Sequence, residues 1–382
     1  MSKDKSGKTK AGNKNPAQDT QAEQLGQLRE KIDAVDLQML DLLNKRAGFA
    51  LDVAEVKKQH AVDLPPVFYR PEREAQVLRN LIEKNPGPLS DEKIALLFRQ
   101  IMSACLALEQ PLRVAYLGPP GTFTQMAAFK QFGEGVNDKS MPTVDDVFKD
   151  VEAETSNYGV VPVENSTEGV INHTLDNFLE SNLKVCGEVE LRIHHNLMIA
   201  PEATEESVTR IYSHQQTLAQ CRRWLDGHWS RVPRIAVTSN AEAALKVTQE
   251  SGAAAIASEM AAELYGLKIV SSKIEDKSDN TTRFLIIGQE HIGPSGNDKT
   301  SMMVSTRNRP GALYHLLEPF HRHDISLTSI ETRPSSTGMW SYVFFIDCEG
   351  HQTDESFQQV LQEINQDALE VKILGSYPRA VT

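Results

Sequence analysis

The sequence predicts a multidomain protein with an all-α segment, an α/β segment and an α+β segment, in that order. Apolar residues recur at three- and four-residue spacing from 25 to 60, which indicates a long amphipathic helix. Between about 112 and 290, short apolar strands alternate with helical stretches, which is typical of α/β folds. The last 80 or so residues follow the order strand, helix, strand, strand, helix, strand, which is that of a ferredoxin-like sandwich.

Composition excludes several classes of protein. The 382 residues include 52 acidic and 40 basic side chains, so the net charge of −12 argues against a nucleic-acid partner or an anionic membrane. No apolar run approaches the ~18 residues of a membrane-spanning helix. The four cysteines are scattered and form no CxxC pair, so we expect no metal site, no disulfide framework and a cytoplasmic location. Residues 1–24 have no apolar core, and we expect a disordered tail rather than a signal peptide.

The all-α segment, residues 25–111, should contain a helix over 25–60 and two shorter ones over 70–84 and 91–110. Two short helices cannot cover so long an apolar stripe, so we expect a homodimer. Charged or reactive side chains lie among the apolar positions of the three helices: Arg46, Lys57, Arg73, Glu74, Cys105 and Glu109.

Charges in a helical core must be paired with one another or bind a charged ligand. A core with more cations than acids suits a small polyanion, and internal ion pairing is the alternative. Arg29 lies 17 residues before Arg46, about 26 Å along one helix. It could therefore reach the same ligand only from an antiparallel partner helix.

The α/β segment should contain a mostly parallel sheet with strands at 113–118, 158–164, 210–214, 234–240, 253–258 and 283–288. Its helices are expected at 124–132, 144–154, 168–180, 217–226 and 240–250. Polar residues gather in three clusters after or before these strands: Thr122 and Thr124; Glu164, Asn165, Ser166, Thr167 and His173; and Thr281, Thr282 and Arg283. Polar groups at strand ends commonly form a binding site. His194 and His195 suggest only a strand pair, since no third metal ligand has suitable spacing.

Residues 25–111 resemble the helical chorismate mutase domain, through LREKIDAVDLQMLDLLNKRAGFALDVAEVK, YRPEREAQVL and LFRQIMSACLALEQ. The resemblance implies an intertwined dimer in which Arg29 enters the partner's site. It implies that Arg46 and Lys57 hold the substrate carboxylates and ether oxygen. The family's Arg-Glu pair is Arg73 and Glu74, and Glu74 is expected to accept a hydrogen bond from the substrate hydroxyl. Three further site positions differ from the best-known bacterial relative: Arg70, Cys105 and Glu109. The rearrangement is unimolecular, so positioning and charge suffice and no cofactor is implied.

Residues 112–290 resemble prephenate dehydratase, through YLGPPGTFTQMAA, GVVPVENSTEGVI, YSHQQTLAQC and TTRF. The implied fold has two lobes like a periplasmic binding protein, 112–190 with 270–290, and 191–269. Thr282 matches the residue that the family regards as essential, and a relay from Glu164 or His173 could supply its proton. Other site positions that the resemblance implies are Glu164, Asn165, Ser213, His214 and Gln220.

After a linker at 292–298, residues 300–378 resemble the ACT regulatory domain. Its two phenylalanine-binding motifs stand here as Gly311-Ala312-Leu313 and Glu331-Thr332-Arg333-Pro334. The amides at the start of a helix near Gly311 could take the amino-acid carboxylate. The alternative is a plain dimerisation module.

The combined resemblance is to the bifunctional chorismate mutase–prephenate dehydratase family with an ACT domain. It implies conversion of chorismate to prephenate and then to phenylpyruvate, with feedback inhibition by phenylalanine. Arogenate as the second substrate and a cytosolic amino-acid-binding sensor are the alternatives. The sequence leaves open the strength of inhibition, channelling of prephenate and oligomers above the dimer.

Overall fold

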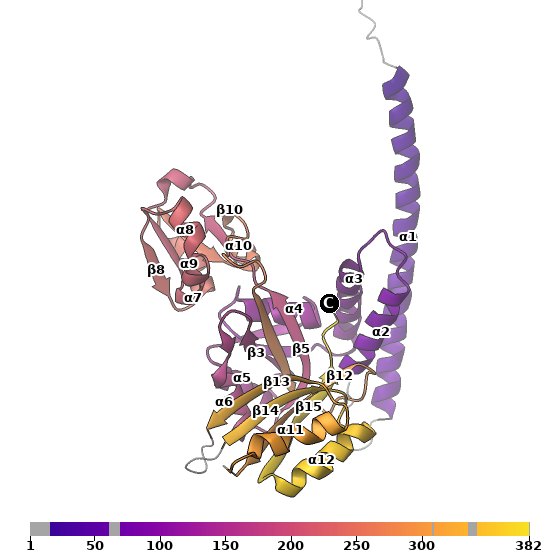
Figure 1. Ribbon diagram of the computed structural model, residues 1–382. Coiled ribbons are helices and arrows are strands. Elements are labelled where there is room, and N and C mark those ends of the chain that lie inside the picture. Colours follow the sequence, from indigo (N-terminus) through magenta and orange to yellow (C-terminus); the bar gives the residue numbers. More distant parts are fainter. Residues whose placement is uncertain (1–15, 61–68, 308, 335–341, 382) are drawn as a thin grey trace, which may run out of the picture. The chain divides into compact units, whose positions relative to one another are not determined.

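The computed structural model describes residues 16–60, 69–307, 309–334 and 342–381 (Figure 1). The chain divides into two compact units, residues 1–66 and 67–382. The described part of the first unit is a single helix, α1 (Pro16–Gln59), of 44 residues, or about 66 Å. Among the described residues, no helix has the length and apolar character needed to cross a bilayer.

Helix α1 begins earlier than the sequence predicts. Residues 16–24 are helical rather than disordered, and the other expected tail residues, 1–15, lie outside the described residues. Gln21, Ala22, Glu23 and Gln24 have good helix propensity. Extending an existing helix costs less free energy than nucleating a new one, so the helix begins before Leu25, the first residue of its apolar stripe.

The second unit begins with α2 (Pro71–Glu83) and α3 (Asp91–Glu109), as predicted within a residue or two. Pro71 occupies the first turn of α2, where its missing N–H costs no hydrogen bond. Ser90 caps α3, because its side-chain oxygen accepts a hydrogen bond from the Lys93 N–H at 3.4 Å.

The first lobe of the α/β region is a sheet with strand order β2-β1-β3-β11-β5, and β4 pairs with β3. Its elements are β1 (Arg113–Leu117), α4 (Phe123–Phe132), β2 (Asn137–Met141), α5 (Val144–Glu152), β3 (Tyr158–Asn165), β4 (Gly169–Val170), α6 (Asn172–Glu180), β5 (Lys184–Arg192) and β11 (Thr281–Gly288).

The second lobe is a sheet with strand order β10-β6-β9-β7-β8. Its elements are β6 (Asn196–Ile199), η1 (Glu205–Ser207), β7 (Arg210–His214), α7 (Gln215–Gln220), α8 (Arg222–His228), β8 (Arg234–Val237), α9 (Asn240–Gln249), β9 (Ala253–Ala257), α10 (Glu259–Tyr265) and β10 (Lys268–Ser271). The chain crosses between the lobes twice, at 193–195 and at 272–280.

The prediction of mostly parallel sheets is wrong. Strand β11 returns from the second lobe and inserts antiparallel between β3 and β5, and β6 runs antiparallel to β9 and β10. The predicted helix 168–180 starts later, after β4, and the predicted helix 217–226 is two helices, α7 and α8. Strands β2, β4, β5, β6 and β10 and helix α10 were not predicted. Strand β2 gives no strand signal because its sequence NDKSM is polar and it lies exposed at a sheet edge.

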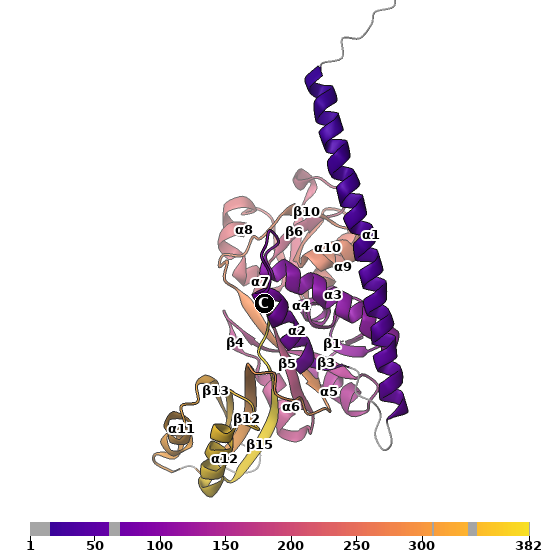
Figure 2. The same ribbon diagram turned by 90° about the vertical axis from the view of Figure 1, so that its right-hand side faces the viewer.

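The C-terminal domain has the predicted ferredoxin-like order: β12 (Asp298–Thr306), α11 (Ala312–Arg322), β13 (Leu327–Pro334), β14 (Tyr342–Glu349), α12 (Glu355–Asp367) and β15 (Glu370–Pro378). Its antiparallel sheet has strand order β13-β14-β12-β15. Helices α11 and α12 cover one face of this sheet (Figure 2). Their buried side chains form one cluster with Met302, Val304 and Ile346.

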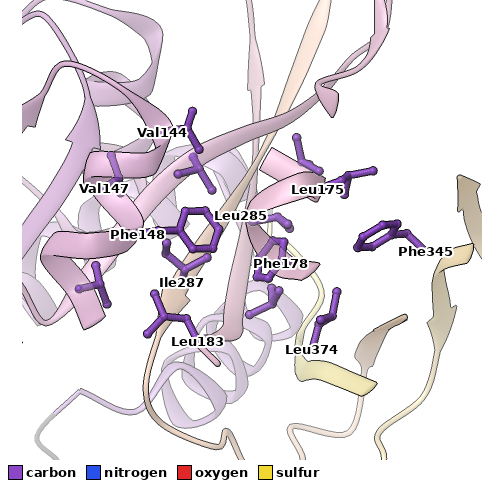
Figure 3. Close-up of a cluster of buried hydrophobic side chains, with 14 of the residues drawn as sticks. Val144, Val147, Phe148, Leu175, Phe178, Leu183, Leu285, Ile287, Phe345 and Leu374 are labelled. Atoms are coloured by element: carbon purple, nitrogen blue, oxygen red, sulfur yellow. The ribbon is translucent and has the colours of Figure 1, made fainter. Parts of the chain in front are cut away.

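The other face of this sheet packs on the first lobe. Phe345 and Leu374 join the buried cluster around Phe178 and Leu183 (Figure 3). The C-terminal domain therefore contributes to the hydrophobic core of the first lobe rather than hanging from a linker.

Candidate active sites

The register between β3 and β11 places Thr282 opposite Asn165. Both residues are buried, and the Asn165 Nδ2 donates a hydrogen bond to the Thr282 hydroxyl oxygen at 2.8 Å. The Asn165 Oδ1 accepts from the Thr167 backbone N–H at 3.0 Å and from its hydroxyl at 2.6 Å. Because a backbone N–H can only donate, this contact fixes which way the Asn165 amide faces. The Thr282 hydroxyl is thus an acceptor toward Asn165, and its own proton is left for another group.

The hydrogen bonds continue across both lobes and close into a ring. The Asn165 Nδ2 also donates to the Asn280 Oδ1 at 3.0 Å, and the Asn280 Nδ2 donates to the Gln220 Oε1 at 3.2 Å. The Gln220 Nε2 donates back to the Thr167 hydroxyl at 3.0 Å. We call these four side chains, Asn165, Asn280, Gln220 and Thr167, the amide ring. Gln220 comes from α7 in the second lobe, so the ring ties the two lobes together beside Thr282.

Three members of the amide ring line an open pocket of about 740 Å³, a volume that includes its mouth. Arg223 and Lys277 contribute cations to this pocket, and the acids at its wall are Glu168, Glu275 and Asp276. The backbone N–H groups of Arg223 and Trp224 hold the Asp276 carboxylate. The lining of this pocket thus has three acids and two cations, and the two backbone amides are occupied by Asp276.

Two residues expected to relay a proton to Thr282 lie elsewhere. Glu164 pairs with Arg283 in the β3–β11 register, and neighbouring strand residues face opposite sides of a sheet. Glu164 consequently lines a different pocket, together with Arg283 and Glu331 of the C-terminal domain. His173 is exposed and contacts the Asp145 carboxylate at 3.2 Å. Neither prediction of a relay through these residues agrees with their positions.

Of the remaining residues of the sequence-predicted dehydratase site, Ser166 directly follows a ring member, and the contacts of the others lie elsewhere in the two lobes. The Ser166 hydroxyl accepts from the Thr281 N–H at 3.0 Å. Within the second lobe, Asn240 accepts from the Ser213 hydroxyl at 2.8 Å and from the His214 N–H at 3.0 Å. Thr122 precedes α4 and donates to the Leu117 carbonyl at 3.1 Å, and Thr124 is buried in the first turn.

His195 belongs to the same neighbourhood, although the sequence suggested only a strand. It lies on the first crossing between the lobes, is 2% exposed, and its Nε2 is 2.8 Å from the Gln220 Oε1. The Phe123 ring packs edge-on against it, with centroids 5.6 Å apart. Burial lowers the pKa of His195, outweighing the hydrogen bond that its ring donates to Gln220 and the field of Glu275, both of which act to raise it. Asn280 was also missed; the sequence signal for it was its position directly before TTRF.

Arg283 points away from Thr282, into a buried cluster of charges under the C-terminal sheet. Its guanidinium contacts Glu188 at 2.9 Å, Asp347 at 2.6 Å and the Tyr377 hydroxyl at 3.0 Å. Lys299 adds a second cation, 2.7 Å from Glu188. Burial alone would raise the pKa of Glu188, but the two cations hold it below its usual value. The expected substrate contact of Arg283 is replaced by an interdomain ion cluster.

The predicted mutase residues are divided between the two units. Helix α1 carries Arg29, Arg46 and Lys57, and the second unit carries the others. In that second unit Arg73 and Arg70 are exposed, Cys105 is buried, and Glu109 is the last residue of α3.

Glu74 is largely buried and pairs with Arg99, whose Nε lies 3.3 Å from its Oε1. Burial raises the pKa of Glu74 to about 7, although Arg99 and a hydrogen bond with Tyr69 act to lower it. The Arg99 Nη2 also donates to the Val381 carbonyl at 3.2 Å. Sequence spacing gave no sign of Arg99 as the partner of Glu74.

The two predicted effector motifs lie on different faces of the C-terminal sheet. Gly311 has a φ of +81° and precedes α11, which covers the outer face and also carries Ala312 and Leu313. The second motif ends β13 with Thr332, Arg333 and Pro334. The Arg333 guanidinium contacts both carboxylate oxygens of Asp176 of α6, at 2.6 and 2.7 Å. Within one chain, therefore, the second motif faces the first lobe rather than Gly311. No group of three or more His, Cys, Asp or Glu side chains in the described ranges is placed to hold a metal ion.

Family models match three successive parts of the chain: chorismate mutase type II over residues 28–110, prephenate dehydratase over 114–292 and the ACT domain over 300–366. The chain is 57% identical over 363 residues to a bifunctional chorismate mutase/prephenate dehydratase of Stutzerimonas stutzeri, covering 95% of this chain and 100% of the relative. It is also 57% identical over 360 residues to the protein of that name in Pseudomonas aeruginosa, covering 94% and 99%.

Among solved structures, prephenate dehydratase from Arthrobacter aurescens in complex with L-Phe is similar, with a TM-score of 0.66 and 30% identity. The similarity covers 70% of this chain and 90% of that one. With its helical, two-lobed and ferredoxin-like parts in the same order, the chain belongs to the family of bifunctional chorismate mutase/prephenate dehydratases.

Proposed function

We propose that this chain rearranges chorismate to prephenate and converts prephenate to phenylpyruvate, carbon dioxide and water, under feedback inhibition by phenylalanine. The matches to both enzyme domains along nearly the whole chain support both activities. We assign the mutase to residues 25–111, the dehydratase to 112–290 and the regulatory domain to 300–378.

The proposed mutase site holds chorismate through cations. The rearrangement breaks one C–O bond and forms one C–C bond within a single molecule, so no proton transfer is needed. Arg46 and Lys57 on α1 would bind the carboxylates and stabilise negative charge on the ether oxygen. Glu74 and Arg73 on α2 would hold the hydroxyl and a carboxylate, which keeps the substrate compact.

We propose that each mutase site is completed by a second copy of the chain. The apolar stripe of α1 is exposed to an extent that an isolated soluble helix would not sustain: Leu25, Leu28, Ile32, Val35, Leu37, Met39, Leu40, Leu42, Leu43, Phe49, Leu51, Val53 and Val56. Pairing with the same stripe of another chain would bury it and would bring Arg29 of that chain to the site. Sedimentation velocity would test this, and a monomer at micromolar concentration would contradict it.

The proposed dehydratase site lies at Thr282 and the amide ring. Prephenate loses its ring carboxylate as carbon dioxide and its ring hydroxyl as hydroxide, which one solvent proton converts to water, and the electron pair of the broken C–C bond completes the aromatic ring. The departing hydroxyl needs a hydrogen-bond donor. Because Asn165 already donates to the Thr282 oxygen, the Thr282 proton is available for that role, and this orientation is the observation that carries the assignment.

Phenylalanine would act through the ACT domain. Its sheet shares a hydrophobic core with the first lobe, and the motif residue Arg333 contacts α6, which follows the loop that holds Asn165 and Thr167. A ligand that shifts this domain would therefore shift elements next to the proposed dehydratase site.

The decisive experiment follows chorismate, prephenate and phenylpyruvate with three variants, with and without phenylalanine. Thr282→Val should lower phenylpyruvate formation from prephenate by about 100-fold or more, the usual cost of a lost transition-state donor, while mutase activity stays. Thr282→Ser, which keeps the hydroxyl, should retain more activity. Arg46→Ala should abolish mutase activity while phenylpyruvate formation from supplied prephenate stays. If one of these changes abolished both activities in a folded protein, the assignment of the two reactions to two separate sites would be contradicted. If the protein turned over arogenate in preference to prephenate, arogenate would be the second substrate.

A further inference from the structure

His195 is a fully buried histidine at the junction of the two lobes, and the proposed chemistry does not use it. Its three neighbours come from three different parts of the dehydratase: Gln220 from α7, Phe123 from α4 and Glu275 from the second crossing. The Glu275 carboxylate accepts from the His195 backbone N–H at 3.0 Å and contacts the His194 Nδ1 at 2.7 Å.

The directions of the hydrogen bonds determine which nitrogen of His195 carries the proton. The Thr167 backbone N–H fixes the Asn165 amide, so the Asn165 Nδ2 must face the Asn280 Oδ1. The Asn280 Nδ2 then faces Gln220, which has to present its Oε1. Reversing the Gln220 amide would set two NH₂ groups against each other.

An oxygen that faces the His195 Nε2 can only accept, so this nitrogen must be the donor. In the neutral imidazole the proton is then on Nε2 and the Nδ1 has a bare lone pair. The Nδ1 is buried and has no hydrogen-bond partner among the described residues. The low pKa caused by burial keeps the ring neutral, with Glu275 and His194 as the charged or titratable groups that face it.

We propose that His195 is a positioning residue of the dehydratase, whose Nε2–H holds the Gln220 amide in the orientation that closes the amide ring and so keeps Asn165, the donor to Thr282, in place. The inference rests on the proposed function of Thr282. It assigns the essential role to the Nε2–H and none to proton transfer by the imidazole.

Two amide variants separate these roles. In His195→Gln the side-chain NH₂ reaches about as far as the Nε2 and can still donate to Gln220, whereas in His195→Asn the amide is too short. We expect kcat for prephenate to stay within about tenfold of the parent in His195→Gln, the range of one altered hydrogen bond. We expect a fall of about 100-fold in His195→Asn, the usual cost of misplaced catalytic groups.

The pH profile provides the readout that a purely structural role would not change. If His195 only positions Gln220, the kcat profile of His195→Gln should overlay that of the parent. Loss of the acid limb in this variant would make His195 a proton carrier and overturn the proposal, as would equal activity of the two variants. His194→Gln is the matched control, since His194 is on the same crossing and contacts Glu275 rather than the amide ring.

Folding of each variant is checked by its mutase activity and circular dichroism. A measurement on the parent needs no variant to fold: ¹⁵N NMR of protein labelled at histidine should find Nδ1 unprotonated and Nε2 protonated for His195, and the opposite tautomer would overturn the proposal. If the parent forms no phenylpyruvate from prephenate, the proposed function fails while the tautomer result still stands or falls on its own.

Discussion

Two carboxyl groups in the helical part, those of Glu74 and Glu109, can act differently in their protonated and ionised forms. Glu74 is surrounded by Arg99 and Tyr69, and burial raises its pKa to about 7. Glu109 is the last residue of α3, at a position that the resemblance to the mutase family places in the site. An amide donates a hydrogen bond at any pH, but a carboxyl group donates only when it is protonated. Both residues are therefore expected to make properties of the enzyme depend on pH.

Glu109→Gln should make mutase activity less sensitive to alkaline pH. If Glu109 donates to the ether oxygen, the parent loses activity once the carboxyl group ionises, because a carboxylate would repel the charge that develops there. The variant should keep more of its activity at high pH, measured as kcat/KM for chorismate from pH 5 to 9. Superimposable profiles of the parent and the variant would remove Glu109 from the role of donor.

Glu74 should make folding stability fall as the pH rises. Its pKa in the folded protein lies above the unfolded value of 4.5, so the folded state binds the proton more tightly. The contribution is complete below about pH 4.5 and is lost as the pH rises through about 7. Urea unfolding should show a larger decrease in the free energy of unfolding between pH 5.5 and 8 in the parent than in Glu74→Gln. An equal decrease in both proteins would show that Glu74 does not titrate in this range.

Strand β11 connects the proposed dehydratase site with the C-terminal domain, because successive side chains along it face opposite sides of the sheet. Thr282 faces the amide ring, and the next residue, Arg283, faces the C-terminal domain. The same strand thus carries the proposed hydrogen-bond donor and one of the strongest interdomain contacts. Any movement of the C-terminal domain that displaces Arg283 would also displace Thr282 along this strand.

Arg283→Met should destabilise the protein strongly. The change leaves Asp347 without its cation and leaves Glu188 with Lys299 alone, and breaking a buried ion pair costs about 3–5 kcal/mol. The matched control is Arg322→Met, which removes ion pairs with Glu318 and Glu363 at an exposed side chain and should cost no more than about 1 kcal/mol. Similar urea midpoints for the two variants would contradict the importance of the buried cluster.

The elements themselves were more predictable from the sequence than their pairing. The α2 and α3 boundaries follow from Pro71, Ser90 and the apolar period. The insertion of β11 between β3 and β5 is a long-range pairing with no local signal, and it decides which strand residues share a face. The resemblance named Asn165, Gln220 and Thr282 as site residues, and the structure brings them together through the amide ring. Glu164 was expected to relay a proton to Thr282 but lies on the opposite face of the sheet.

Residues that act through others were the ones that the sequence could not identify. Asn280 and His195 are on the two crossings between the lobes, and each contacts Gln220 of the second lobe. These contacts form only in the folded protein, so the local sequence gives no sign of them. Arg99 similarly matters because Glu74 is buried next to it. Motif resemblance marks groups that meet the substrate, but the partners of those groups depend on packing.

At the scale of the whole molecule, the regulatory domain is also a structural part of the dehydratase. Phe345, Leu374 and Tyr377 complete the core of the first lobe, and Tyr377 and Asp347 hold Arg283. Truncation near Gly293 would expose that core and leave Arg283 unpaired. A truncated chain would therefore lose stability along with inhibition, and point substitutions are the better way to separate the two effects.

The proposed dimer should allow two inactive mutase variants to restore each other. If Arg29 enters the partner's site, a heterodimer of Arg29→Ala and Arg46→Ala has one site with both arginines and one site with neither. Coexpression with two different affinity tags and tandem purification would isolate the heterodimer, which should show about half of the parental mutase activity, since one of its two symmetric sites is intact.

The matched controls are the two homodimers, each carrying one of the changes in both chains, which should both lack activity. Dehydratase activity should be the same in all these preparations, because Arg29 and Arg46 lie on α1 and Thr282 lies on β11, so it serves as the measure of correctly folded protein. If the purified heterodimer were as inactive as the homodimers, Arg29 and Arg46 would have to serve the same site from one chain. The roughly 26 Å between them along one helix leaves no small ligand that could touch both, so an inactive heterodimer would contradict the intertwined dimer, whereas an active Arg29→Ala homodimer would remove Arg29 from the site.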